Sequence, residues 1–189
     1  MKCILFLIIC SILVISCKNE PTPKALVNVR HSLVSQDLLT SSKVVAYRFA
    51  LPGEGSGQLV ESGFSLFNAE GQLNLEQLER LKVKEAILTS DQTERFVEAV
   101  YAEEDVTSAA ACYDPHHIFL FYDDSGSLIN VVEVCFSCYN LHAFPVLDKS
   151  IWRRHDFRTL ARLCDEIGIG MSSGSAEDFI RMHDERDSI

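Results

Sequence analysis

The stretch that decides the fold is His117-Ile-Phe-Leu-Phe-Tyr-Asp-Asp-Ser-Gly-Ser-Leu-Ile-Asn-Val-Val-Glu-Val-Cys-Phe136. Two runs rich in aromatic and β-branched residues, 117–122 and 128–136, flank the turn-forming segment Asp123-Asp-Ser-Gly126. This pattern predicts an antiparallel β-hairpin near the centre of a sheet.

The remaining elements are predicted outward from this hairpin. Thr89 and Gln92 form a capping-box pattern, and apolar residues recur behind them at helical spacing, which predicts a helix over 90–103. The other predicted elements are strands over 43–50, 58–67 and 82–88, a short helix over 75–81, and a helix over 152–167 that Gly168 ends. The expected class is α+β, a small and mostly antiparallel sheet with about two packed helices.

The composition divides the chain into four predicted regions. Residues 1–16 are expected to be a signal peptide, and residues 17–42 a lipidated N-terminus with a flexible, polar tether. Residues 43–170 form a single α+β domain in this scheme. Residues 171–189, rich in Ser, Gly and charge, are expected to be a polar tail.

The N-terminus resembles that of bacterial lipoproteins. Lys2 precedes an apolar run over 4–15 that is too short for a permanent membrane helix. The run ends in Val14-Ile-Ser-Cys17, which resembles the lipobox of that class. The resemblance implies that Cys17 carries a lipid and that this lipid anchors the protein to the bacterial cell envelope, on the outer membrane or a periplasmic face. The alternative is a secreted protein with a chance cysteine at position 17.

The net charge of the chain restricts the classes of partner that it can bind. Loss of residues 1–16 removes Lys2 from the 17 basic residues and none of the 27 acidic ones. A strongly acidic domain is repelled by phosphate backbones and anionic lipid heads, which argues against nucleic-acid binding. The expected partners are therefore the membrane, through the lipid, and an envelope protein or ligand that the sequence does not identify.

Cysteine and histidine side chains gather around the hairpin. If Tyr122 pairs with Leu128, Cys112 lies opposite Cys138, while His116 faces Val134 and His117 faces Glu133. A slip of one residue in the turn changes these pairs but keeps Cys112 beside Cys135 to Cys138.

Three interpretations of this cluster compete. The first is a pair of structural disulfides, in which Cys112 bonds to Cys138 or Cys135 and Cys164 takes the remaining thiol. The second is a zinc site built from Cys135 and Cys138 with Cys112 and one of His116, His117 or His142. The third is a thiol-disulfide redox centre at Cys135-Phe-Ser-Cys138, although such motifs normally precede a long helix.

The segments Cys112-Tyr-x-Pro-x-His117 and Cys135-Phe-x-Cys138, with the hairpin between them, resemble a group of uncharacterised bacterial lipoproteins. The resemblance covers about 43–138 and implies no activity. The leading hypothesis is a non-enzymatic binding or structural envelope lipoprotein with no cofactor, and the alternative is a zinc-binding protein or metal-dependent enzyme.

Overall fold

The computed structural model describes residues 26–28, 38, 40–54, 64–68, 72–102, 113–145 and 155–187. The strands are β1 (Leu26–Asn28), β2 (Lys43–Phe49), β3 (Gln72–Asn74), β4 (Lys82–Ile87), β5 (His117–Tyr122), β6 (Leu128–Cys135) and β7 (Asn140–Phe144). The helices are α1 (Leu75–Leu81), α2 (Ser90–Tyr101), α3 (Phe157–Glu166) and α4 (Ala176–Asp187).

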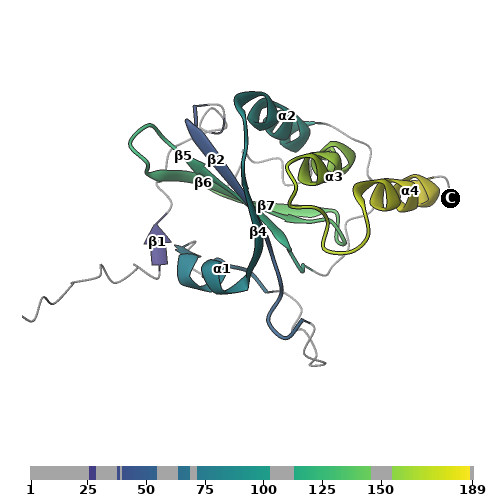
Figure 1. Ribbon diagram of the computed structural model, residues 1–189, viewed down its shortest axis with the longest axis horizontal. Helices are drawn as coiled ribbons and strands as arrows, with labels where there is room; N and C mark the ends of the chain where they lie inside the picture. The colour runs from purple at the N-terminus through teal and green to yellow at the C-terminus, as the bar shows by residue number, and fades with distance from the viewer. Residues whose placement is uncertain are drawn as a thin grey trace, which may run out of the picture.

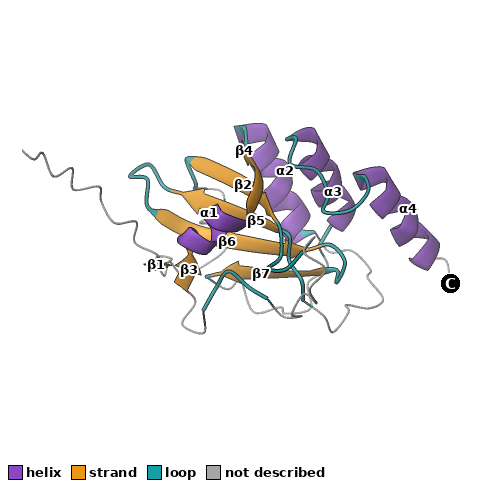
Figure 2. Cartoon of the chain, turned by 60° about the horizontal axis from the view of Figure 1, so that its bottom comes forward, coloured by secondary structure: helices purple, strands orange, loops and turns teal. Residues whose placement is uncertain are grey.

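A five-stranded antiparallel sheet in the order β4-β2-β5-β6-β7 forms the middle layer of the molecule. Helices α2, α3 and α4 lie on one face, whereas α1 and the two-stranded sheet β1-β3 lie on the other (Figures 1 and 2). This arrangement confirms the predicted α+β class. It also gives the sheet two apolar faces, so the central strands β5 and β6 are buried along almost their whole length.

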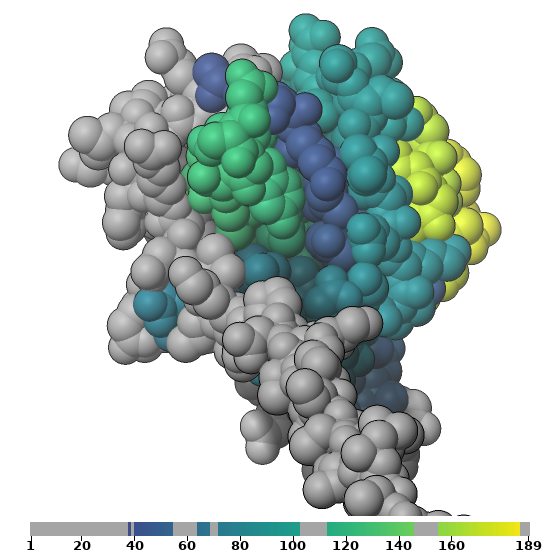
Figure 3. Space-filling view, turned by 60° about the vertical axis from the view of Figure 1, so that its left-hand side comes forward, coloured from purple at the N-terminus to yellow at the C-terminus, as the bar shows by residue number. Residues whose placement is uncertain are grey.

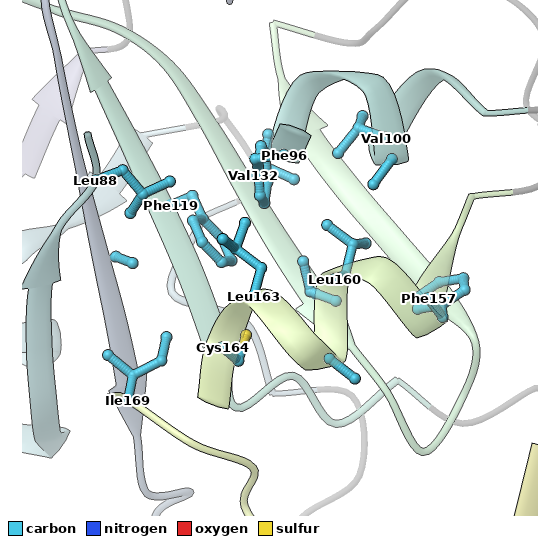
Figure 4. Close-up of a cluster of buried hydrophobic side chains, with 14 of the residues drawn as sticks. Leu88, Phe96, Val100, Phe119, Val132, Phe157, Leu160, Leu163, Cys164 and Ile169 are labelled. Carbon is cyan, nitrogen blue, oxygen red and sulfur yellow. The ribbon is translucent and has the colours of Figure 1, made fainter. Parts of the chain in front are cut away.

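The helix-side core explains where α2 and α3 sit. Side chains such as Phe96 and Leu160 pack against Phe119 and Val132 of the sheet (Figure 4). Thr89 caps α2 through the predicted capping box with Gln92. On α3 the cap is Asp156, whose side chain accepts from the Thr159 N–H, so this helix begins at Phe157 and not at the predicted residue 152.

The hairpin is confirmed, but its predicted register is wrong. Tyr122 pairs with Leu128 as expected, and then a bulge shifts the ladder by one residue. His117 therefore lies opposite Val134, and Glu133 lies opposite Ile118. Because neighbouring residues of a strand point to opposite faces, this slip puts the His117 and Glu133 side chains on different sides of the sheet.

The C-terminal segment is a packed helix, which corrects the prediction of a polar tail over 171–189. In α4, Ala176, Phe179, Ile180 and His183 are buried, and the first three belong to the helix-side core. Their spacing of i, i+3, i+4 and i+7 is that of one helix face. The short stripe is surrounded by charged residues, which is why composition alone suggested a tail.

The domain also begins earlier than the predicted boundary at residue 43. Strand β1 pairs with β3, and Leu38 is fully buried in the helix-side core. Strand β7, which was not predicted, follows directly after the turn at 136–139. Of the predicted strand over 58–67, residues 58–63 lie outside the described part, and Phe67 forms a single bridge with Leu73. Among the described helices, none has the length and apolarity needed to span a membrane.

Candidate functional site

Glu133 is the central group of the site on the face opposite the three large helices. Its side chain, on β6, is fully buried. The Leu66 N–H donates to Oε1 at 3.0 Å, and the hydroxyls of Ser65 and Tyr113 donate to Oε2 at 2.9 and 3.2 Å. One carboxyl group thus holds the segments at 64–68 and 113–116 onto the sheet.

Burial dominates the electrostatics of this carboxyl group. It raises the pKa of Glu133 to about 7, although the three hydrogen bonds act in the opposite direction. Burial, followed by the charge of Glu133, raises the pKa of Tyr113 far above its usual range. Among the described residues, no cation forms an ion pair with Glu133, so the ionised form is stabilised only by neutral donors.

The two cysteines of the Cys-x-x-Cys motif lie beside this group, in and next to the tight turn that joins β6 to β7. The Cys135 thiol, on the same face as Glu133, lies 3.4 Å from the carbonyl oxygen of Asp114 and 3.3 Å from Oγ of Ser137. The Sγ atom of Cys138 lies 3.7 Å from the same hydroxyl, and both thiols are buried. The segment after Cys138 is strand β7, so the helix N-terminus that lowers a thiol pKa in thioredoxin-like centres does not follow this motif.

Two of the predicted zinc-ligand histidines lie near this end of the sheet. His142 lies opposite Glu133 on β7, and its ring stacks on Tyr113 with centroids 4.0 Å apart. Burial lowers the pKa of His142, so its neutral form is favoured. His116 contacts the Asp114 carbonyl oxygen through Nδ1 at 3.0 Å. Within the described ranges, no group of three His, Cys, Asp or Glu side chains has the arrangement of a metal site.

His117, the third candidate histidine, belongs to a different cluster on the helix side. It forms one cross-strand row with Arg48 of β2 and Lys84 of β4. Each of the three basic side chains contacts a carbonyl oxygen of the loop between α3 and α4. The partners are Met171 for Arg48 at 2.6 Å, Gly170 for His117 at 2.8 Å and Gly168 for Lys84 at 3.1 Å.

The hydrogen bonds from this row hold the loop between α3 and α4 against the sheet. Since a carbonyl oxygen only accepts, His117 must carry its proton on Nε2, and Nδ1 has no hydrogen-bond partner among the described residues. Burial lowers the pKa of His117 to about 4. The ring is therefore neutral at pH 7 and serves as a hydrogen-bond donor.

No family model, curated protein or solved structure matches the chain. The interpretation of the two clusters therefore rests on their geometry.

The positions of the cysteines restrict the disulfide hypothesis. Cys164 is buried in the helix-side core (Figure 4), on the opposite face of the sheet from Cys135. The structure has no bridge between these two residues, and their positions on opposite faces of the sheet exclude one. Cys112 lies outside the described residues, and its predicted pairing with Cys135 or Cys138 stays a prediction, as does its role as a zinc ligand.

Sequence reasoning singled out the cysteines and histidines but missed the groups that organise them. Glu133 was treated only as a neighbour of His117, while Arg48 and Tyr113 had no predicted role. One signal for Glu133 was present in the sequence, since it is a carboxylate inside the apolar run Val131-Val-Glu-Val134. A carboxylate in a buried strand is seldom left without hydrogen-bond donors, so the pattern indicates that other segments supply donors to Glu133. No comparable signal exists for Arg48, whose acceptor lies 123 positions away in the chain.

Proposed function

We propose that this protein is an exported, lipid-anchored envelope protein whose α+β domain serves as a non-enzymatic binding or structural module. The observation that carries the proposal is Val14-Ile-Ser-Cys17, placed directly after an apolar run of signal-peptide length. These residues lie outside the described part of the chain, so the anchor is argued from sequence.

The described domain supports the non-enzymatic half of the proposal through the use it makes of its buried polar groups. Both oxygens of Glu133 bind donors from other segments of the chain, and Nε2 of His117 binds the loop carbonyl of Gly170. Groups used in this way fix loops onto the sheet. In contrast, a catalytic acid or base must be able to reach a substrate proton.

The anchor is tested by mass spectrometry and membrane partition. The native protein, expressed in a bacterial host, is expected to begin at Cys17 with a mass increase that corresponds to acyl chains, and to stay with membranes at high salt. The Cys17→Ala variant is expected to lose the lipid and the membrane association. An unmodified mature chain, released in the soluble fraction, would refute the proposal.

A zinc-binding protein is the second candidate, and one observation favours it. The thiols of Cys135 and Cys138 both lie next to the Ser137 hydroxyl, and Tyr113, which directly follows Cys112 in sequence, bonds to Glu133 beside them. Metal analysis combined with alkylation under non-reducing conditions separates the candidates. Stoichiometric zinc with free thiols supports the metal site, whereas a Cys112 disulfide without metal supports the structural cluster.

A further inference from the structure

The link between the proposed lipid and the folded domain is short. Residue 17 and the start of β1 at Leu26 are nine positions apart. β1 is tied to the domain by its pairing with β3, in which Leu26 lies opposite Asn74 and Asn28 lies opposite Gln72. The tether is therefore about a third of the length that the sequence predicted from residues 17–42.

This length is small compared with the domain. Nine residues reach at most about 30 Å when fully extended, and a flexible chain of that length averages less than 20 Å from end to end. A compact domain of about 160 residues has a radius of gyration of about 15 Å and hence a diameter near 40 Å. The start of β1 can therefore never be the point of the domain furthest from the lipid surface.

The fold then determines which elements lie near the bilayer. β1 and β3 share one side of the large sheet with α1, whose Leu78 packs in the core of that side. Helices α2, α3 and α4 cover the other side (Figures 1 and 2). With β1 held close to the membrane, the layer of three helices is the part that extends away from it.

The distribution of charge favours the same orientation. β1 and β3 carry no charged side chain, and α1 carries two carboxylates and one arginine. By contrast, α2 carries three carboxylates with one arginine, α3 two of each, and α4 five carboxylates with two arginines. Anionic headgroups repel the more acidic helical layer more than the β1–β3–α1 end, so electrostatics and tether length act in the same direction.

From these observations we infer that the β1–β3–α1 end of the domain faces the lipid surface and that the helical layer faces outward, where a partner can reach it. The inference rests on the proposed lipid at Cys17. In the space-filling view, the segment that contains the hairpin lies beside β2, and the segment that contains β4 and α2 lies on the other side of β2 (Figure 3).

Energy transfer to the bilayer tests this orientation in the full lipidated protein. An azide-bearing phenylalanine analogue replaces either Glu76, exposed on α1, or Met182, which is 57% exposed on α4. Each variant receives a donor dye and is reconstituted into vesicles of zwitterionic and anionic lipids that contain a headgroup acceptor. Because the two sites lie on opposite sides of the sheet, transfer from position 76 should exceed that from position 182 by about twofold or more.

A longer tether is the matched control. A flexible spacer of about 20 glycine and serine residues between Lys24 and Ala25 roughly doubles the average end-to-end distance of the link, and the difference between the two positions should shrink. Equal transfer with the natural link, or a difference that the spacer leaves unchanged, would overturn the inference. Failure of the lipid proposal looks different, because the protein would then not associate with vesicles at all.

Discussion

Arg48 and His117 lie directly opposite each other on β2 and β5, and they donate to the carbonyl oxygens of two consecutive residues, Met171 and Gly170. Two neighbouring strands therefore hold the loop that leads from α3 to α4. These two hydrogen bonds explain why α4, which lies in the polar segment 171–189, has a fixed position on the domain.

Removing the guanidinium group should loosen this loop. Arg48→Met keeps most of the aliphatic stem but leaves the Met171 carbonyl oxygen without its donor, which should lower the free energy of unfolding by about 1–3 kcal/mol. Lys84→Met is the matched control, because the bond from Lys84 to Gly168 is exposed and should contribute less. Urea denaturation measures both variants, and an equal loss in the two would contradict the role assigned to Arg48.

His117 should make the domain less stable in acid. Its pKa is about 4 in the folded state and near 6.5 when exposed, so the unfolded chain binds more protons between these values. The stabilisation that depends on neutral His117 is complete above pH 6.5, and about 3 kcal/mol of it is lost as the pH falls to 4. Because Glu133 titrates in the opposite direction over the same range, the loss is measured in a Glu133→Gln background. Unfolding experiments between pH 4 and 7 should show the loss in Glu133→Gln, and the added substitution His117→Gln should abolish it. His116→Gln, altered next to it in a partly exposed ring, should retain the loss.

Glu133 should change the pH dependence of stability in the opposite direction, because its contribution to the free energy of unfolding falls as the pH rises. Its pKa is about 7 in the folded state against 4.5 as an ordinary glutamate, so its contribution is complete below pH 4.5 and disappears as the pH rises through 7. Glu133→Gln keeps an acceptor for Leu66 and does not ionise. The variant should match the native protein at pH 4.5 and exceed its stability by up to about 3 kcal/mol at pH 8.

The exposed carboxylate Glu98 on α2 provides the control for this prediction. Glu98→Gln changes the same functional group outside the buried cluster and should leave the difference between pH 4.5 and pH 8 as it is in the native protein. A pH-independent difference between the native protein and Glu133→Gln would show that the buried carboxyl group is not the one that titrates. Because Glu133 and His117 act oppositely between pH 4.5 and 6.5, the native profile should be nearly flat there.

The two faces of α4 should respond very differently to truncation. Phe179 is buried against the rings of Phe136 and Tyr139, so Phe179→Ala should cost about 3–5 kcal/mol. Met182, on the exposed face of the same helix, should tolerate alanine with a change below about 0.5 kcal/mol. Thermal and chemical unfolding compare the two variants, and similar effects would mean that α4 does not contribute to the core.

The thiol of Cys164 should be unreactive in the folded protein. Burial raises its pKa well above the usual range, and the reactive species is the thiolate. Alkylation at pH 8 should modify Cys164 only after denaturant is added, as mass spectrometry of the peptides would show. An introduced cysteine at the exposed position Ser172 should react at once, and rapid labelling of Cys164 in the native state would disprove its burial.

Local patterns were sufficient for much of the fold. The hairpin strands, the capping box at Thr89 and the edge strand over 82–88 were all predicted because their signals lie within a few neighbouring residues. The bulge in the hairpin was not, because one extra residue in β6 changes the register without changing the pattern of apolar residues.

The candidate site was less predictable than the fold for a related reason. Its hydrogen bonds join segments that are far apart in sequence, such as Leu66 to Glu133, and nothing in the local composition encodes such a pair. Strand β7 was missed because Asn140-Leu-His-Ala-Phe144 has only a weak alternation, and its stability comes from pairing with β6. Both features depend on tertiary contacts.

The position of β2 between β4 and β5 also bears on the order in which the sheet can form. β2 is the first long strand to be synthesised, yet its partner β5 begins more than sixty residues after β2 ends. A sheet assembled from such distant pieces closes slowly, since the intervening chain must be ordered first. For the export that we propose, slow closure of the sheet would keep the chain unfolded for longer, as passage through a narrow channel requires.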